Sequence, residues 1–307
     1  MELLELFNIQ GTLFLMILVG ALVKKLGIVD EAGRRCLTDL CVNVIIPCNI
    51  LKSCLIDLDS SVLRACEILV VVALAIQIIS VILNKFLYKN YPEAQNKVLK
   101  YCTLVSNGGF LGNGVAEGVY GTLGLLYASM YLIPMRIVMW SAGTSYFVAG
   151  GTDKKKVVRN ILTHPCLVAV YIGMAIMLLH IPLPTLLTST ITGIGNCNCN
   201  TAITMFIIGT ILVDVPLLTI VNPTTLWISA LRLVLLPAAA WGISLALGLE
   251  PVATGVAVIM TGMPAGSTAA IFAARYGSDA VFATKCVVLS TLLSMLTIPV
   301  WCYLIGA

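Results

Sequence analysis

The chain is 307 residues long, 59% of its residues are hydrophobic, only 10% are charged, and its formal net charge is +4. About a quarter of the residues of a soluble domain are charged, so this composition excludes a chain built of soluble domains and predicts a multi-pass protein of the lipid bilayer. No basic run with interleaved aromatic residues points to a nucleic-acid partner.

A membrane-spanning helix needs about 20 mostly apolar residues, and ten such runs follow one another along the chain. They cover 6–23, 35–55, 62–87, 98–119, 123–148, 157–179, 186–213, 226–247, 252–274 and 281–305. A polar loop at 150–156 separates the fifth run from the sixth. The expected halves are therefore 1–150 and 151–307, and two halves of five spans each must have opposite orientations in the membrane.

The basic residues predict how the chain is oriented. Of the 18 Lys and Arg residues, 14 lie in loops after spans one, three, five and nine, two lie on the opposite side, and Arg136 and Arg232 fall inside spans. Basic loops stay in the cytoplasm. We therefore expect a plasma (inner) membrane protein with both termini extracytoplasmic.

The fourth span holds an unusual stretch, Ser-Asn-Gly-Gly-Phe-Leu-Gly-Asn-Gly-Val-Ala-Glu-Gly at 106–118. Each glycine weakens a helix by about 1 kcal/mol relative to alanine. Broken backbone at this depth persists only where protein or a water-filled cavity satisfies it. The stretch therefore predicts a discontinuous helix at a binding site.

The ninth span carries a matching interruption five spans later. Residues 110–115 parallel residues 260–265: each has a glycine, one further residue and then a helix breaker, Gly114 in the first and Pro264 in the second. Both segments are followed by Tyr-Gly, at 120–121 and 276–277. Interrupted segments at corresponding positions of two halves indicate a transporter site, although single breakers can also merely kink packed helices.

In each broken span, the half after the break begins near the midplane with free N–H groups and the positive end of its dipole. Two such ends would bind an anion, most simply a carboxylate. We expect Asn113 to cap one end, and Ser267 and Thr268 to offer hydroxyls at the other.

The ionisable residues inside spans leave several roles open. Glu117 could couple transport to protons or another cation, or close a capping box with Gly114 as the N-cap. Arg136 and Arg232 could pair with acids, bind backbone carbonyls or hold substrate charge. Asn43 and Pro47 interrupt the second span and could form a wall of the site.

Other chemistry has little support in the sequence. The 11 cysteines are scattered through apolar runs, where free cysteine behaves as a small buried hydrophobe, so no metal is expected. No Ser-His-Asp set, phosphate-binding loop or His-Glu-x-x-His motif is present, and the chain is not expected to be an enzyme.

The chain resembles the auxin efflux carrier family, in particular its bacterial members. The likeness covers nearly the whole length and rests on motifs in a specific order. They are V-N-V-I-I-P at 42–47, S-N-G-G-F-L-G-N-G at 106–114, A-I-T-M-F-I-I-G-T-I-L at 202–212, L-R-L-V-L-L-P at 231–237, M-P-A-G-S-T-A-A-I-F-A-A-R-Y-G-S-D-A at 263–280 and L-S-T-L-L-S at 289–294.

The resemblance implies an all-α membrane fold of ten helices in two inverted five-helix repeats, like the bile acid:sodium symporters. Helices four and nine would be broken and would cross. A scaffold would comprise 1–60 and 151–215, and a transport domain would comprise 61–150 and 216–307. The transport domain would move the substrate in an elevator-like motion. Gly114 and Ala202 stand where the family often has proline.

Family substrates are small organic anions: auxin in plants, and malate or malonate in several bacteria. We therefore expect a secondary carrier of a small carboxylate. Its transport would be coupled to H⁺ or to Na⁺, or would be uncoupled. Related folds suggest a homodimer formed through the scaffold. The alternatives are a ligand sensor and a channel. The expected substrate-binding residues are Asn43, Pro47, Asn107, Gly112, Asn113, Gly114, Gly262, Pro264, Ser267 and Thr268, and the expected coupling or charge-balancing residues are Glu117, Arg136 and Arg232.

Overall fold

The computed structural model describes residues 3–55, 60–143, 145–147, 163, 165–179, 181–195, 202–203, 205–207, 209–210, 213 and 219–306. Over these residues the ordered structure is helical, apart from one isolated backbone bridge between Ser106 and Ala265. The expected all-α class is confirmed. The ten-span count and the inverted repeat stay predictions.

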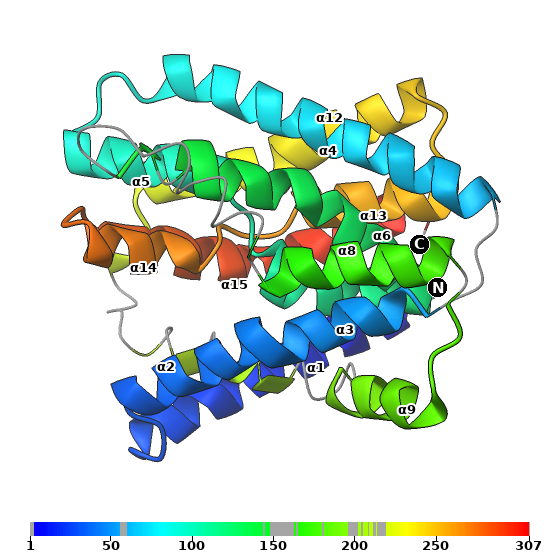
Figure 1. Cartoon of the computed structure of the whole chain (residues 1–307). Coiled ribbons are helices and arrows are strands. Elements are labelled where there is room, and N and C mark those ends of the chain that lie inside the picture. Colours follow the sequence, from blue (N-terminus) through cyan, green and yellow to red (C-terminus); the bar gives the residue numbers. More distant parts are fainter. Residues whose placement is uncertain are drawn as a thin grey trace.

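The helices lie roughly along a common direction and pack around several buried apolar clusters (Figure 1). In chain order, with η marking a π-helical turn, they are α1 (Leu3–Lys25), α2 (Glu31–Leu40), η1 (Cys41–Ile45), α3 (Ile46–Ser53), α4 (Ser60–Leu87), α5 (Glu93–Leu104), η2 (Gly108–Gly112), α6 (Asn113–Val138), η3 (Met139–Gly143), α8 (Pro165–Leu178), α9 (Thr185–Ile194), α11 (Pro223–Ala230), η5 (Leu231–Leu235), α12 (Leu236–Ala246), α13 (Pro251–Thr261), α14 (Thr268–Arg275) and α15 (Ala280–Leu304).

Four described stretches are long and apolar enough to cross a membrane: Ser61–Leu87, Asn113–Gly143, Pro223–Ala246 and Ala280–Leu304. Shorter apolar helices cover Val168–Met177, Thr185–Ile194 and Pro251–Thr261. Several apolar helices of this kind are typical of a multi-pass membrane protein.

The stretch Asn113–Gly143 contains a sharp turn at Gly121. There the backbone has φ 65° and ψ −153°, which is not helical. A Cβ added to Gly124 would lie only 2.3 Å from the carbonyl oxygen of Ala116, whereas residues eight apart in a straight helix are separated by about 12 Å. The chain therefore folds back on itself at Gly121, close to the predicted boundary between 98–119 and 123–148.

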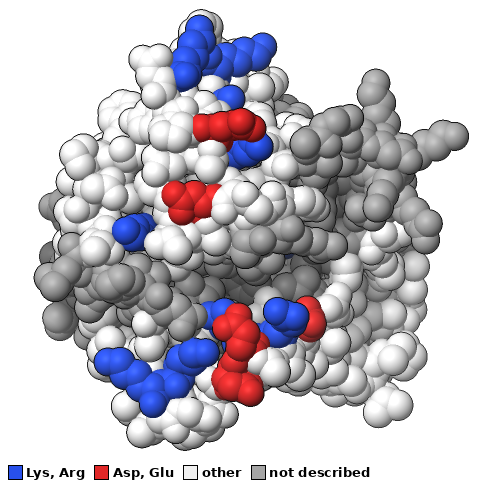
Figure 2. Space-filling view, turned by 90° about the vertical axis from the view of Figure 1, so that its left-hand side faces the viewer, with Lys and Arg blue, Asp and Glu red and all other residues white. Residues whose placement is uncertain are grey.

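Charged side chains gather at one end of the molecule. Figure 2 looks onto the end where α2 and α5 begin and α14 ends, and it shows Lys and Arg interspersed with Asp and Glu. Both termini lie at the opposite end (Figure 1). The side of the membrane on which each end lies stays a prediction.

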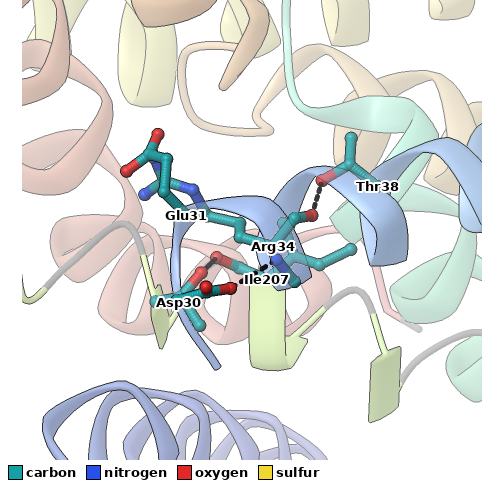
Figure 3. Close-up of polar contacts among 7 residues, drawn as sticks. Asp30, Glu31, Arg34, Thr38 and Ile207 are labelled. Atoms are coloured by element: carbon teal, nitrogen blue, oxygen red, sulfur yellow. Dashed lines mark hydrogen bonds and ion pairs between the residues drawn. The ribbon is translucent and has the colours of Figure 1, made fainter. Parts of the chain in front are cut away.

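The start of α2 at this charged end is fixed by local polar contacts (Figure 3). Asp30 Oδ1 accepts a hydrogen bond of 2.7 Å from the backbone N–H of Gly33, which makes Asp30 the N-cap. Arg34 pairs with Glu31 at 2.5 Å, and Thr38 Oγ1 donates to the Arg34 carbonyl. The helix α2 therefore begins directly after the turn that follows α1, and it precedes the apolar part of the second span.

Two of the π-helical turns precede prolines. Pro47 and Pro237 lack an N–H and cannot bond the carbonyl four residues earlier, and η1 and η5 stand immediately before them. At the second site, the buried indole of Trp301 donates a 2.7 Å hydrogen bond to the carbonyl of Leu233 that Pro237 leaves free. At Pro237, therefore, a side chain from α15 satisfies the released carbonyl inside the helix bundle.

Glycines bring α1 and α3 close to later segments of the chain. A Cβ at Gly20 would lie 2.4 Å from the Phe206 carbonyl oxygen, and one at Gly173 would lie 2.6 Å from Cys54 Sγ. These contacts join parts of the expected scaffold, 1–60 and 151–215. The division into a scaffold and a transport domain itself stays a prediction.

Candidate functional site

The two predicted helix breaks are present, and they lie against each other. Ser106 and Ala265 form an antiparallel bridge. The N–H of Asn107 donates to the Pro264 carbonyl at 2.7 Å, and the N–H of Gly266 donates to the Val105 carbonyl at 2.9 Å. Two short non-helical segments, one from each half of the chain, thus pair inside a helical protein.

Proline explains the break after α13. Because Pro264 has no N–H, the carbonyl of Met260 loses its helical partner, and Ser106 Oγ lies 3.4 Å from it instead. The next amide, that of Ala265, donates to Ser290 Oγ at 3.1 Å, so the carbonyl of Thr261 is also released.

The break after α5 occurs without a proline. Val105 has extended backbone (φ −109°, ψ 114°), and the N–H of Asn107 turns to Pro264 rather than to the carbonyl of Thr103. The pairing with the second break therefore releases the last carbonyls of α5, in a region that the following glycines leave weakly helical.

Arg232 binds the carbonyls that both breaks release. Its side chain is buried on π-turn η5. Nη1 donates to the Thr103 carbonyl at 2.8 Å, and Nη2 lies 3.2 Å from the carbonyls of Thr261 and Met263. Of the roles left open for Arg232, the structure shows the binding of carbonyls.

The second half of the first broken span begins earlier than expected. The Asn107 carbonyl accepts the first helical bonds, from the N–H groups of Leu111 and Gly112. Asn113 has helical backbone (φ −59°, ψ −44°) and α6 has no side-chain cap. The prediction that Asn113 caps the half-helix is therefore wrong, and so is the capping box with Gly114, because the pairing at 105–107 places the break upstream of both glycines.

Arg136 lies beside this half-helix, and no described residue bonds its buried Nη1. Arg136 is 5% exposed. Its Nη2 would lie 3.8 Å from a Cβ on Gly109. Leu132 and Met135, on the same face of α6, contact Gly108 and Ser106. The guanidinium thus lies close to Gly109, in the first turn of the second half-helix.

Two buried amide side chains near the break also have polar atoms that no described residue bonds. Asn107 and Asn113 are 3% and 0% exposed. Asn107 Nδ2 and both polar atoms of the Asn113 side chain have no hydrogen bond. Buried amides are normally satisfied, so these groups are available to a bound molecule.

Methionines and glycines fill the space where the two breaks meet. A Cβ on Gly112 would lie 2.9 Å from Met260 Sδ and 3.0 Å from Met263 Cγ, and one on Gly108 would lie 2.8 Å from Leu132 Cδ2. Gly114 is buried in α6, and Gly262 ends α13. Apolar side chains therefore pack closely against the glycines of the crossing.

The hydroxyls predicted at the second half-helix have different surroundings. Ser267 precedes α14 and is 7% exposed, without a capping hydrogen bond. Thr268 Oγ1 accepts a 2.9 Å hydrogen bond from the Tyr101 hydroxyl. Thr268 therefore ties α14 to α5, and a contact between either hydroxyl and a substrate stays a prediction.

Glu117 is paired with a lysine from another part of the chain. Lys52 Nζ, at the end of α3, lies 3.0 Å from Glu117 Oε1, and the two side chains are 21% and 8% exposed. The second oxygen, Oε2, is buried and has no partner. This pair could not be predicted from the sequence, because nothing local links α3 to α6.

Asn43 and Pro47 are expected in a wall of the site, and that role stays a prediction. Asn43 is exposed and donates to the carbonyl of Asp39 in its own helix, and Pro47 is partly buried at the start of α3. Asn49, two residues further on, is 1% exposed and neither polar atom of its amide has a partner. Residues 196, 198 and 200, the corresponding asparagines in the other half, lie outside the described residues.

Within the described part of the chain, no group of three or more His, Cys, Asp or Glu side chains could hold a metal ion. A surface hollow of about 670 Å³ lies along α2 and is lined by residues of that helix, including Glu31, Arg35 and Asp39. The crossing itself is enclosed, because Ser106, Asn107 and Asn113 are all buried. A substrate would therefore reach it only after neighbouring helices move.

A family model described as membrane transport protein matches the chain twice, over residues 11–156 and 152–302. A protein of Methanothermobacter thermautotrophicus described as an uncharacterized transporter is 26% identical over 295 residues, covering 94% of this chain and 95% of the relative. The two successive matches agree with a chain made of two related halves.

Proposed function

The chain belongs to the membrane transport protein family, the family of the auxin efflux carriers, and from this premise we propose that it is a secondary carrier of a small organic anion. The anion would bind by its carboxylate beside the crossing. An enzyme function has no support in the family or in the relative.

One observation carries this proposal: Arg136 is a buried cation whose Nη1 has no hydrogen-bond partner among the residues that the structure describes. A charged side chain inside a membrane protein is costly unless it is paired. Gly109 lies beside Arg136, at the start of a half-helix whose N–H groups also favour an anion. A carboxylate placed there would compensate both the guanidinium and the helix dipole.

The remaining polar groups are suited to orienting the bound substrate. Asn107 Nδ2 is a free donor at the break, and Asn113 supplies a free donor and a free acceptor one and a half turns later. Met260, Met263 and Leu132 provide an apolar side. A few placed polar groups on an otherwise apolar surface are typical of small-molecule sites.

Transport requires that the enclosed site opens to each side in turn. We propose an elevator-like motion in which the crossing moves with α4, α5, α6 and α11–α15, while α1, α2, α3, α8 and α9 stay fixed. Three polar links hold the moving group together: Arg232 with α5 and α13, Tyr131 with Thr261, and Tyr127 with Glu250. These links let the crossing move as one body.

The proposal is tested by ligand-induced stabilisation of the purified protein in lipid nanodiscs. The panel contains monocarboxylates, malate and malonate, indole acids, and the uncharged amide of each acid. We expect at least one acid to raise the unfolding temperature, its amide to fail, and Arg136→Ala to weaken binding at least tenfold. Arg64→Ala is the matched control, because Arg64 is exposed on α4.

Flux is then measured as counterflow of the binding acid in proteoliposomes. Exchange at carrier rates supports the proposal. Stabilisation without any flux would indicate a sensor, and flux far above carrier turnover would indicate a channel. Equal binding of the acid to the wild type and to Arg136→Ala would remove the proposed site.

A further inference from the structure

The carbonyls around Arg232 form a cage at the end of two half-helices. Thr103 contributes from the end of α5, and Thr261 and Met263 contribute from the end of α13. All three lie 2.8–3.2 Å from guanidinium nitrogens. In carriers with broken helices, unwound carbonyls and the C-terminal ends of half-helices are the groups that bind a coupling cation.

The charges at this cage balance without a further ion. The C-terminal end of a helix carries about −0.5 elementary charge, so two such ends present about −1 in total by that principle. Arg232 supplies +1 and is 3% exposed. None of its described hydrogen-bond partners is a carboxylate.

We infer that Arg232 is a built-in cation that fills the position where a broken-helix carrier otherwise binds a coupling ion, so that this protein needs no sodium. The inference rests on the proposed carrier function and assigns a positioning role to Arg232. It also separates the two arginines inside spans: Arg232 neutralises the C-terminal ends of the first half-helices, and Arg136 faces the N-terminal end of a second one.

A filled cage has a consequence for transport. A mobile cation would have to displace a side chain that makes three hydrogen bonds, so a sodium gradient has no site through which to act here. The crossing would then keep its geometry whether or not sodium is present. Coupling to protons is a separate matter that the cage leaves open.

The experiment removes the built-in cation and asks whether sodium replaces it. Arg232→Ala leaves three carbonyls around a vacated space, which suits a small hard cation. Thermal unfolding is measured in nanodiscs in sodium chloride and in choline chloride at equal ionic strength, without any substrate. We expect the wild type to unfold at the same temperature in both salts.

For Arg232→Ala we expect a lower unfolding temperature in choline and a saturable rise of about 3 °C or more in sodium, since a ligand that binds only the folded state stabilises it. Arg232→Lys keeps a cation in the cage and should stay insensitive to sodium. Arg136→Ala also removes a buried arginine but leaves no carbonyl cage, and should gain no sodium response.

Arg232→Gln serves as a second uncharged variant in case Arg232→Ala does not fold. Purification of either uncharged variant in sodium but not in choline also supports the inference. It is overturned if sodium stabilises the wild type over choline, if the uncharged variants respond equally to both salts, or if neither folds in sodium. Because no carboxylate is used, these results are independent of the ligand panel that tests the carrier function.

Discussion

Alanine substitutions at two neighbouring glycines of the crossing should have different consequences: one should lower stability, and the other should weaken substrate binding. Gly109 and Gly112 lie in the same π-helical turn, so replacing either with alanine gains a similar helix propensity, about 1 kcal/mol. At Gly112 the new methyl group would lie 2.9 Å from Met260 Sδ and 3.0 Å from Met263 Cγ. At Gly109 its nearest neighbour is Arg136 Nη2 at 3.8 Å, an ordinary contact.

The magnitude follows from this difference in space. Overpacking costs about 1–3 kcal/mol, and the flexible end of Met260 can move aside, whereas Met263 Cγ is nearer the backbone. We therefore expect Gly112→Ala to be less stable than Gly109→Ala by about 1–2 kcal/mol. Gly109→Ala should keep its stability but bind the anionic substrate more weakly, because its methyl group occupies the space beside the Arg136 guanidinium.

Both effects can be read from the same two variants. Unfolding temperatures in nanodiscs report the difference in stability, and the acid identified in the ligand panel reports the difference in affinity. Equal stabilities would show that the two methionines do not close the crossing against Gly112. Unchanged affinity in Gly109→Ala would show that the space beside Arg136 is not where the carboxylate binds.

Three further substitutions test other parts of the site. Lys52→Met leaves the buried Glu117 carboxylate unpaired and should cost more stability than Lys52→Met with Glu117→Gln, by about 1–3 kcal/mol; equal losses would mean that the ion pair has no net effect. Trp301→Phe leaves the Leu233 carbonyl unbonded and should cost about 1–3 kcal/mol, measured by thermal unfolding; an unchanged unfolding temperature would contradict this. Pro264→Ala restores an N–H that allows α13 to continue, and it should slow counterflow more than it weakens substrate binding; unaltered flux would show that the break does not depend on proline.

The existence of both breaks could be predicted because its causes are local. Glycines that weaken a helix and a proline without an N–H are visible in the sequence, and the structure interrupts both spans. The position of the first break could not be predicted in the same way. It depends on Asn107 pairing with Pro264, which is 157 residues away in the chain, and for that reason the expected cap at Asn113 is wrong.

The roles of the ionisable groups show the same limit. The sequence identified Glu117, Arg136 and Arg232 as unusual, because charges are expensive inside a membrane. It left their partners open. Lys52 reaches Glu117 from α3, and the carbonyls bound by Arg232 come from α5 and α13, which no spacing along a single helix could indicate.

By itself, the sequence determined that the chain is a helical membrane protein, that two spans are interrupted, and that buried charges stand near the interruptions. These features follow from the composition of the chain and from the local effect of glycine and proline on the helix that contains them. Only the tertiary structure decided that the interruptions meet, that one arginine binds carbonyls, and that the other keeps a buried nitrogen unbonded among the described residues. Hydrogen bonds between distant segments form only after packing, because each needs two groups that the chain brings within about 3 Å.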